Sequence, residues 1–409
     1  MKKLFMFSLI LLVVLNGCSN VSMPDKDISK SDLAPIDPAG PMVKEETAIT
    51  DFGVRCLQLL VEDGENTLIS PMSLLNALGM TANGASGETL KEMEAVFGLS
   101  KEELNEYLYY YRFYLPDSRD YKVNLANSIW IKDAEKLQLK DEFKQKNLDY
   151  YEADMFMEPF NHATKQTINK WVKEQTDGMI PEIVDEIPED AVMYLINALS
   201  FDAKWEDEYD KYQVHDLFFT TEDGTDQKAR MMFADENIYL EDEDATGFMK
   251  YYKDKEYAFV ALLPDEGVKI ADYVQSLTGE RVKKLMDEAT ETKVKTKVPV
   301  FEYEYSLEMS DIFKSLGMEQ AFDSKRADFS ELGTSDDGNI FISRILHKTY
   351  IELGQKGTKA AAATAVEMAD GGAPPQENKE VFLDRPFVYM IVDTEHNLPL
   401  FIGTLMSVE

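Results

Sequence analysis

The sequence predicts an α+β protein in which residues 46–409 form one large domain. Two observations carry this prediction: segments with capping residues and an apolar face suit helices, and apolar or alternating runs suit strands. The chain has 409 residues, of which 44% are hydrophobic, enough for one large core or two ordinary ones. No internal repeat or low-complexity linker divides residues 46–409, so we expect a single domain.

Two early segments carry helix signals. Ser70 can accept hydrogen bonds from the first free N–H groups of a helix whose first residue is Pro71. Thr89 and Glu92 form a capping-box pattern, which predicts the start of a second helix. Gly98 follows the apolar face of that segment and predicts its end.

Three later segments suit strands. Residues 192–201 are an almost unbroken apolar run, which is typical of a strand covered on both faces. Residues 340–354 alternate between apolar and polar, which predicts a half-buried strand. His347 lies on the apolar face, where we interpret it as a hydrogen-bonded core histidine rather than a catalytic one. Two apolar segments flank residues 393–397, DTEHN, and predict a hairpin.

The first 20 residues, MKKLFMFSLILLVVLNGCSN, resemble the signal peptide of a bacterial lipoprotein. Two lysines precede an apolar run at 4–15, which is too short to span a bilayer. We expect residues 1–17 to be a signal peptide and Cys18 to carry lipid, with plain secretion as the alternative. Residues 18–45 are polar, hold four prolines and read as a tether. The predicted location is a bacterial membrane (outer membrane or cell surface), to which the lipid holds the domain.

Composition excludes several functions. The formal net charge of −34 disfavours a nucleic-acid partner, because affinity for phosphates requires Lys and Arg. With Cys18 lipidated, Cys56 has no partner for a disulfide, and its apolar neighbours at helical spacing predict a buried thiol. The four histidines lie outside metal-ligand spacing, and no Walker, dinucleotide or GxSxG motif occurs. We therefore expect no metal, no cofactor and no catalytic residues.

In the segment at 357–375, GTKAAAATAVEMADGGAPP, charged and bulky apolar side chains fall on alternate positions. The two charged residues that precede Asp370, Lys359 and Glu367, fall on odd positions, whereas Val366 and Met368 fall on even ones. This segregation is the pattern of a half-buried strand. The alternatives are a flexible linker or a helix, since alanine is the best helix former and a poor strand former.

Several segments resemble the serpin family, and the resemblance covers the chain from about residue 46 to its end. ELGQKGTKAAAATAVEM resembles the hinge and the first part of the serpin reactive-centre loop. NTLISPMSLLNALGMTANGASGETLKEM resembles an early helix and the turn after it. LINALSFDAKW is similar to the strand beside the insertion gap. The segments ILHKTYIELGQKGT, DRPFVYMIVD and LPLFIGTL match the C-terminal pattern in order.

The resemblance implies a serpin fold: a mixed central β-sheet A, two further sheets, surrounding helices and an exposed reactive-centre loop. It also implies a monomeric suicide-substrate inhibitor. A target protease cleaves the loop and forms an acyl-enzyme, and the loop then inserts as a new strand. About 14 residues at ~3.3 Å each would carry the covalently bound protease roughly 45 Å. The alternatives are a non-inhibitory serpin-fold binding or structural protein, and an enzyme such as an esterase or peptidase.

The resemblance also assigns roles to individual residues. Small residues at the inward positions of the hinge favour an inhibitor over a non-inhibitory serpin. The shutter is a polar cluster under the opening sheet, and the breach is the region at the top of the gap. The hinge is Gly357, Thr358, Lys359, Ala360, Ala361, Ala362, Ala363 and Thr364; the shutter is Ser70, Ser73, Asn197 and His347; the breach is Trp205, Gln355 and Val300.

Two positions depart from the family pattern. Gln355 stands where a Glu is usual, and Val300 stands where a basic partner is common. Losing both members of an ion pair is milder than leaving one charge unpaired, so we expect an altered latch at the top of the sheet.

The family's usual count from Gln355 places the scissile bond at Gly371-Gly372, with Met368, Ala369 and Asp370 as rival bait residues. Asp370 would point into the core after insertion, so insertion should end near it. Small bait residues suit an elastase-like or subtilisin-like serine protease or a papain-like cysteine protease. Cleavage after Asp370 would instead indicate an Asp-specific enzyme.

Overall fold

The computed structural model describes residues 42–61, 64–115, 118–133, 137–188, 191–335, 338–358 and 379–409. The expected α+β class is confirmed, because helices pack around three sheets of six, nine and two strands within these residues. The α-helices are α1 (Val43–Leu60), α2 (Pro71–Ala82), α3 (Gly87–Phe97), α4 (Lys101–Tyr114), α5 (Asp141–Tyr151), α6 (His162–Gln175), α7 (Ile270–Ser276), α8 (Gly279–Asp287) and α9 (Ser310–Ser315).

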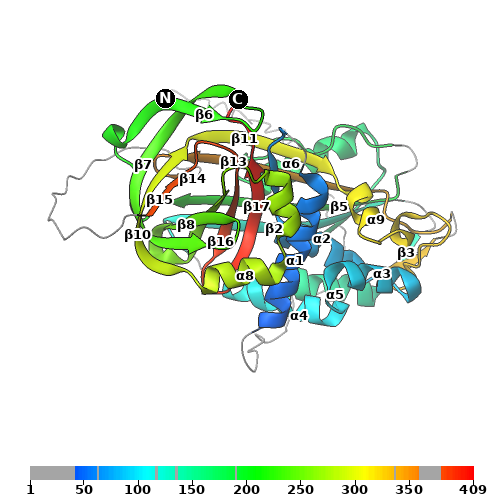
Figure 1. Ribbon diagram of the computed structural model, residues 1–409. Coiled ribbons are helices and arrows are strands. Elements are labelled where there is room, and N and C mark those ends of the chain that lie inside the picture. Colours follow the sequence, from blue (N-terminus) through cyan, green and yellow to red (C-terminus); the bar gives the residue numbers. More distant parts are fainter. Residues whose placement is uncertain are drawn as a thin grey trace, which may run out of the picture.

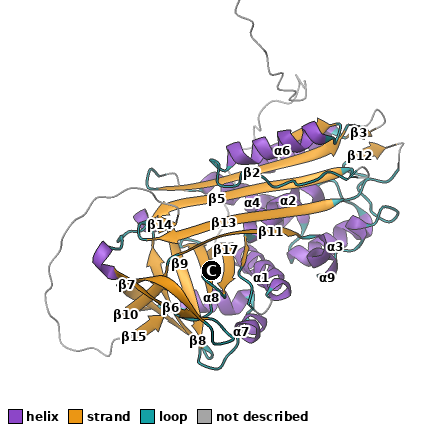
Figure 2. Ribbon diagram, turned by 90° about the horizontal axis from the view of Figure 1, so that it is seen from above, coloured by secondary structure: helices purple, strands orange, loops and turns teal. Residues whose placement is uncertain are grey.

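The six-stranded sheet holds the strands that the sequence places beside the insertion gap. It is mixed: β13 pairs antiparallel with β11 and parallel with β5, and β5 pairs antiparallel with β2. Its long strands lie side by side in Figure 2. In spatial order the strands are β11 (Phe301–Glu308), β13 (Arg344–Gly354), β14 (Gly357–Thr358), β5 (Met193–Lys204), β2 (Tyr121–Lys132) and β4 (Asp154–Glu158).

The nine-stranded sheet contains the predicted C-terminal hairpin, whose strands β16 and β17 lie side by side in Figure 1. Its strands in order are β1 (Thr67–Ile69), β17 (Leu398–Leu405), β16 (Phe387–Asp393), β9 (Tyr257–Pro264), β8 (Ala245–Tyr251), β7 (Asp226–Glu241), β10 (Thr290–Pro299) and β15 (Lys379–Phe382), with β6 (Val214–Thr220) paired to β7. The two-stranded sheet joins β12 (Gly333–Ser335) to β3 (Leu137–Leu139).

Of the two helix starts predicted from local sequence, one is confirmed and one is wrong. The start of α2 is confirmed, because the Ser70 hydroxyl accepts the N–H of Ser73 at 3.2 Å. The capping box at Thr89 is wrong: the N-cap position of α3 is Ser86, three residues earlier, and the helix begins at Gly87. The buried Thr89 hydroxyl instead accepts the N–H of Asp328 at 2.9 Å. A contact with a distant loop therefore replaces the local cap.

The N-terminal boundary of the domain also differs from the prediction. Helix α1 begins at Val43, three residues before the expected boundary at 46. Glu45 and Glu46 lie in its first turn, where carboxylates favour the positive end of the helix. The fully buried Cys56 lies in the middle of α1 as expected, and burial raises the pKa of its thiol to about 12.

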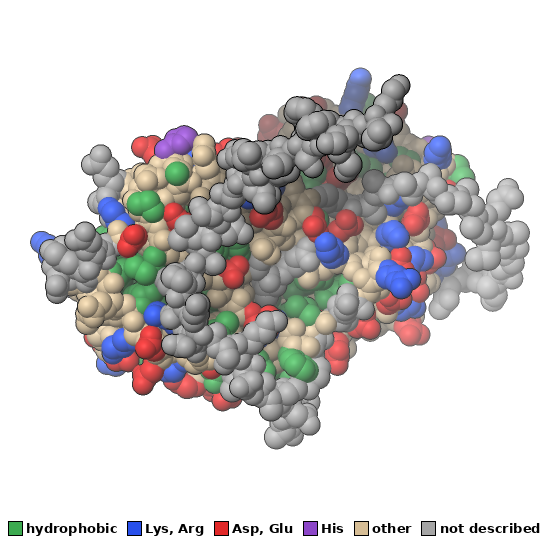
Figure 3. Space-filling view, turned by 180° about the vertical axis from the view of Figure 1, so that it is seen from behind, with side chains coloured by type: hydrophobic (Ala, Val, Ile, Leu, Met, Phe, Trp, Pro, Cys, Tyr) green, Lys and Arg blue, Asp and Glu red, His purple; other side chains and the backbone are tan. Residues whose placement is uncertain are grey.

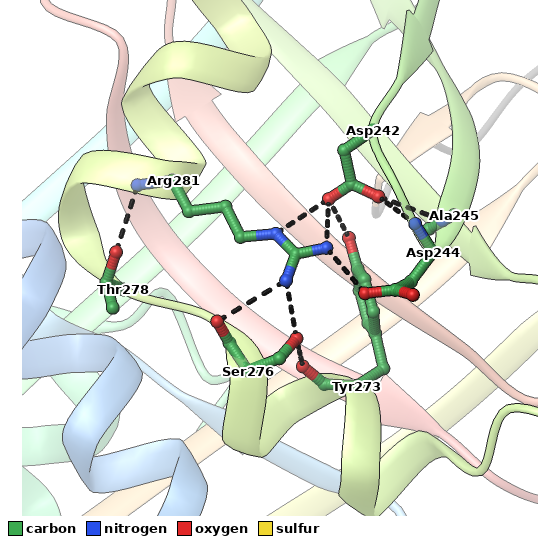
Figure 4. A network of polar contacts seen from close by, with 7 residues as sticks. All are labelled: Asp242, Asp244, Ala245, Tyr273, Ser276, Thr278 and Arg281. Atoms are coloured by element: carbon green, nitrogen blue, oxygen red, sulfur yellow. Dashed lines mark hydrogen bonds and ion pairs between the residues drawn. The ribbon is translucent and has the colours of Figure 1, made fainter.

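A network of charged and polar side chains joins helices α7 and α8 to the nine-stranded sheet. The Arg281 guanidinium of α8 bonds to Asp242 at 2.8 Å and to Asp244 at 3.2 Å, both at the β7–β8 turn, and to the Ser276 hydroxyl at 2.7 Å (Figure 4). This network fixes α7 and α8 over one end of the sheet. Elsewhere, acidic and basic side chains are interspersed over the face in Figure 3. No helix among the described residues is long and apolar enough to cross a membrane.

Candidate functional site

A two-residue strand, β14, lies between β13 and β5 at one end of the six-stranded sheet. After β13, the chain turns at Gln355 and Lys356 and pairs back on its parent strand, with Thr358 opposite Leu353. On its other side, Thr358 pairs with Ala203 of β5, also antiparallel. The segment that the sequence predicts as a strand thus begins as the central strand of this sheet.

Beyond β14 the two neighbouring strands part. Within the described residues, β13 and β5 pair directly only at the far end of the sheet, where residues 344–346 meet residues 194–196. Residues 347–352 of β13 and residues 197–202 of β5 therefore face each other without a shared ladder of hydrogen bonds. Unpaired strand edges are a template for another strand, and β14 points between them.

Gly357 makes the turn into this position possible. Its φ angle is 151°, in the region that favours glycine, and a Cβ atom here would lie 1.9 Å from the backbone oxygen of Ala203. Only a residue without a side chain fits so close to β5. The resemblance assigns Gly357 to the hinge, and this geometry gives the reason for a glycine there.

Thr358 is buried, with 2% of its surface exposed, and its hydroxyl lies 2.6 Å from the hydroxyl of Tyr252. Strand β13 alternates, and its inward residues include Ile351 and Leu353. Because directly opposed residues of an antiparallel pair share a face, Thr358 points inward with Leu353. The expected inward direction of the even-numbered residues thus holds for Thr358. Tyr252 carries no signal in the sequence that links it to this site.

Trp205, which the resemblance assigns to the breach, holds the turn before β14. Its indole N–H donates to the Gly354 oxygen and its backbone N–H to the Lys356 oxygen, both at 2.8 Å. The backbone N–H of Tyr209 donates to the Gln355 oxygen at 2.9 Å. Val300 lies one residue before Phe301, the partner of Leu353, and its side chain packs on the core. The top of the gap is therefore held by aromatic residues and backbone bonds.

The predicted shutter residues Ser70, Ser73 and His347 come together beneath the gap. All three are buried, and His347 Nε2 accepts the backbone N–H of Ser70 at 3.1 Å. That nitrogen must then be unprotonated, so the neutral ring carries its proton on Nδ1. Burial lowers the pKa of His347 to about 4. This confirms the interpretation of His347 as a hydrogen-bonded core residue.

A second buried polar contact, between Asn127 and Asn76, was not singled out by the sequence pattern. The amide N–H of Asn127 donates to the Asn76 side-chain oxygen at 3.5 Å and to the Tyr151 carbonyl at 3.4 Å. In the strand register, Asn127 of β2 lies opposite Asn197 of β5. The side chain of Asn197 lies outside the described part of the structure. Asn76 follows Ser73 at helical spacing, and this spacing is the signal that could have indicated it.

Other predicted residues lie outside the described ranges. These are the hinge positions Lys359, Ala360, Ala361, Ala362, Ala363 and Thr364, the bait positions Met368, Ala369, Asp370, Gly371 and Gly372, and the N-terminal signal peptide with Cys18. Their assigned roles remain predictions.

Comparisons of sequence and of structure match this chain over most of its length. An uncharacterized serpin-like protein of Thermococcus kodakarensis is 28% identical over 88% of this chain and 85% of its own. The thermophilic serpin tengpin in its native state superposes with a TM-score of 0.88 at 43% identity, over 93% of this chain and 97% of tengpin. Tengpin in its latent state gives a TM-score of 0.81 at 41% identity, over 92% and 100% of the two chains.

The family model described as serpin (serine protease inhibitor) matches residues 47–408. This match spans nearly all of the described domain, including the split six-stranded sheet, the buried polar cluster and the C-terminal hairpin. The protein therefore belongs to the serpin family, whose members are generally protease inhibitors.

Proposed function

We propose that this serpin inhibits its target protease as a suicide substrate, and that the residues after Thr358 insert between β13 and β5 once the loop is cleaved. The observation that carries the proposal is the position of β14, which is already paired with both strands above two unpaired edges. Insertion would extend the backbone pairing that β14 already makes with β13 and β5, so the new strand would not have to nucleate. The greater similarity to native than to latent tengpin supports a starting state with the sheet still open.

The register of β14 defines where each inserted residue would pair. Thr358 opposite Leu353 and Ala203 sets the alignment, and continuing it places Thr364 opposite His347 and Asn197. The inward residues would then be Ala360, Ala362 and Thr364, which are small enough to enter beside the buried shutter. The same register reaches the first residues of β13 and β5 at positions 367 and 368, just before Asp370. This supports a scissile bond close to Gly371-Gly372.

The driving force would be new backbone pairing and apolar burial in a sheet that is incomplete before cleavage. Such stored strain is a known basis for serpin-type switches. The protein would supply the bait and the insertion, while the protease supplies the catalytic groups and forms the covalent complex. Because none of the candidate bait residues is basic and most are small, the proposed targets are elastase-like, subtilisin-like or papain-like proteases rather than trypsin-like ones.

The test mixes residues 19–409 with one protease of each proposed class and follows the products on denaturing gels and by mass spectrometry. The expected result is an SDS-stable adduct with a released peptide that begins at Gly372 or a neighbouring residue. Melting of the cleaved protein provides the second readout, and a large rise in melting temperature is expected. Cleavage without an adduct and without that rise would overturn inhibition and favour the non-inhibitory binding or structural role.

We also propose that the domain is exported and held at a bacterial membrane by lipid on Cys18. The support is the signal-like segment before Cys18 and the polar tether after it. The test expresses the full chain and its Cys18→Ala variant in a bacterium and fractionates the cells. Only the unchanged protein should partition with membranes and carry the mass of a diacylated N-terminus. Equal partitioning of both proteins into the soluble fraction would contradict anchoring and support secretion.

A further inference from the structure

A buried ion pair lies directly behind the breach. Lys250 of β8 and Glu236 of β7 are 2.7 Å apart, and only 3% and 12% of their side chains are exposed. Burial raises the pKa of Glu236 even though Lys250 is beside it. Removing two charges from water is costly, and apolar residues often stabilise a fold as well as a buried ion pair does. A contribution to the stability of the fold is therefore a weak explanation for the presence of this ion pair.

Lys250 also contacts the aromatic residues of the breach. Its ammonium lies 4.5 Å from the ring centre of Tyr209 and 5.4 Å from that of Trp205, within cation–π range of both. Glu236 fixes the ammonium from the other side through their hydrogen bond. The pair thus holds two rings in one relative arrangement.

These two rings belong to the residues that hold the turn before β14. Trp205 donates to the oxygens of Gly354 and Lys356, and Tyr209 donates to that of Gln355. Trp205 also stacks on Tyr252, with ring centres 4.4 Å apart and planes at 12°, and Tyr252 bonds to Thr358. A continuous series of contacts therefore leads from Lys250 to the first inserted residue.

We propose that Lys250, oriented by Glu236, is a positioning residue that keeps the turn and β14 in the two-residue inserted state and so slows further insertion. The inference rests on the proposed function, since insertion is the step that it controls. It also accounts for the neutral Gln355 and Val300: in this serpin the charged latch lies behind Trp205 rather than across the turn. Without Lys250, the rings of Trp205 and Tyr209 should be less fixed. The turn before β14 should then move more freely, and the sheet should open faster.

The experiment measures sheet opening without a protease. A fluorescent synthetic peptide with the sequence of residues 358–369 is added to the uncleaved domain, and its rate of incorporation is followed. Lys250→Met should accelerate incorporation about tenfold, which corresponds to the loss of a partly desolvated cation–π contact. Glu236→Gln, which leaves the ammonium without its orienting carboxylate, should also accelerate incorporation. Lys250→Arg keeps the positive charge, and its planar guanidinium can stack on the same rings, so its rate should stay within about twofold of the unchanged protein.

The matched control is Lys283→Met, which breaks another half-buried pair, with Glu46 at 3.3 Å, that contacts none of the breach rings. A second readout is the ¹⁹F signal of 5-fluorotryptophan at position 205, assigned by its loss in Trp205→Phe. This signal should move in Lys250→Met and stay in place in Lys283→Met. If Lys250→Met fails to fold, the double variant Glu236→Leu/Lys250→Met removes both charges and should still incorporate the peptide faster.

The outcomes separate this inference from the proposed function. If the unchanged protein takes up peptide but the Lys250 and Glu236 variants match Lys283→Met in rate and leave the Trp205 signal in place, the positioning role is overturned while insertion stands. If the unchanged protein takes up no peptide and gains no stability on cleavage, the proposed function fails and the inference fails with it.

Discussion

The hydroxyls of Tyr252 and Thr358 lie 2.6 Å apart in the protein interior, although the two residues are 106 positions apart in the chain. Tyr252 is fully buried and stacks on Trp205. This contact holds Thr358, the second residue of the hinge, in the core before any cleavage. The inhibitory transition proposed here would begin from this position.

Thr358 provides the first prediction. Thr358→Arg places a long cation at a site that is only 2% exposed, and burying an unpaired charge is costly. Burial of this charge should slow insertion at least about tenfold. The yield of covalent adduct should fall by the same factor, while cleavage of the loop continues. Adduct yield on denaturing gels checks this. The control is Thr358→Val, which keeps the shape of the side chain. An equal adduct yield from Thr358→Arg would contradict the burial of residue 358 before cleavage.

Gly357 provides the second prediction. Gly357→Ala would place a Cβ atom 1.9 Å from the Ala203 oxygen, on a backbone with φ of 151°. The turn must shift, and we expect a loss of about 1–3 kcal/mol in unfolding free energy. Urea unfolding measures this loss. Gly354→Ala is the matched control, because no atom would lie within 4 Å of a Cβ added there and no positive φ is involved. Equal stability of the two variants would argue against the close approach of β14 to β5.

The buried His347 predicts a loss of stability in mild acid. Its folded pKa is about 4, below its ordinary value of 6.5, so the unfolded chain binds the proton first as the pH falls. Stability should be complete above pH 6.5 and decline between pH 6.5 and pH 4, by roughly 3 kcal/mol for this group. His347→Gln should flatten this part of the curve, as measured by denaturant unfolding at several pH values. An unchanged slope would show that the ring does not titrate in this way.

His396 predicts the opposite dependence. Its Nδ1 lies 3.0 Å from a Glu46 oxygen, and the hydrogen bond to Glu46 raises its pKa above the ordinary value. This group stabilises the fold most below its unfolded pKa and loses that contribution as the pH rises through the raised folded value. His396→Gln should therefore cost more stability at pH 5.5 than at pH 8, as measured by denaturant unfolding at the two pH values. A cost that grows with pH would contradict the ion pair between His396 and Glu46.

Several features of the site follow from local sequence pattern. The alternation at 340–354 predicts the buried face of β13, although the strand itself begins at Arg344 because residues 340–343 take no part in the ladder. Ser70 before Pro71 predicts the start of α2. The Thr89 pattern misleads, because Asp328 from a distant loop uses the hydroxyl that a local cap would need.

Local sequence was sufficient to predict the class of the fold, the strands on either side of the gap and the inward direction of Thr358. Each depends on the spacing of apolar and polar residues, which a short segment expresses alone. Only the folded arrangement shows that β14 already occupies the sheet over two residues, that Tyr252 receives Thr358 and that Lys250 and Glu236 stand behind Trp205. These contacts join side chains from separate strands and turns, and only the folded chain brings them within reach of one another.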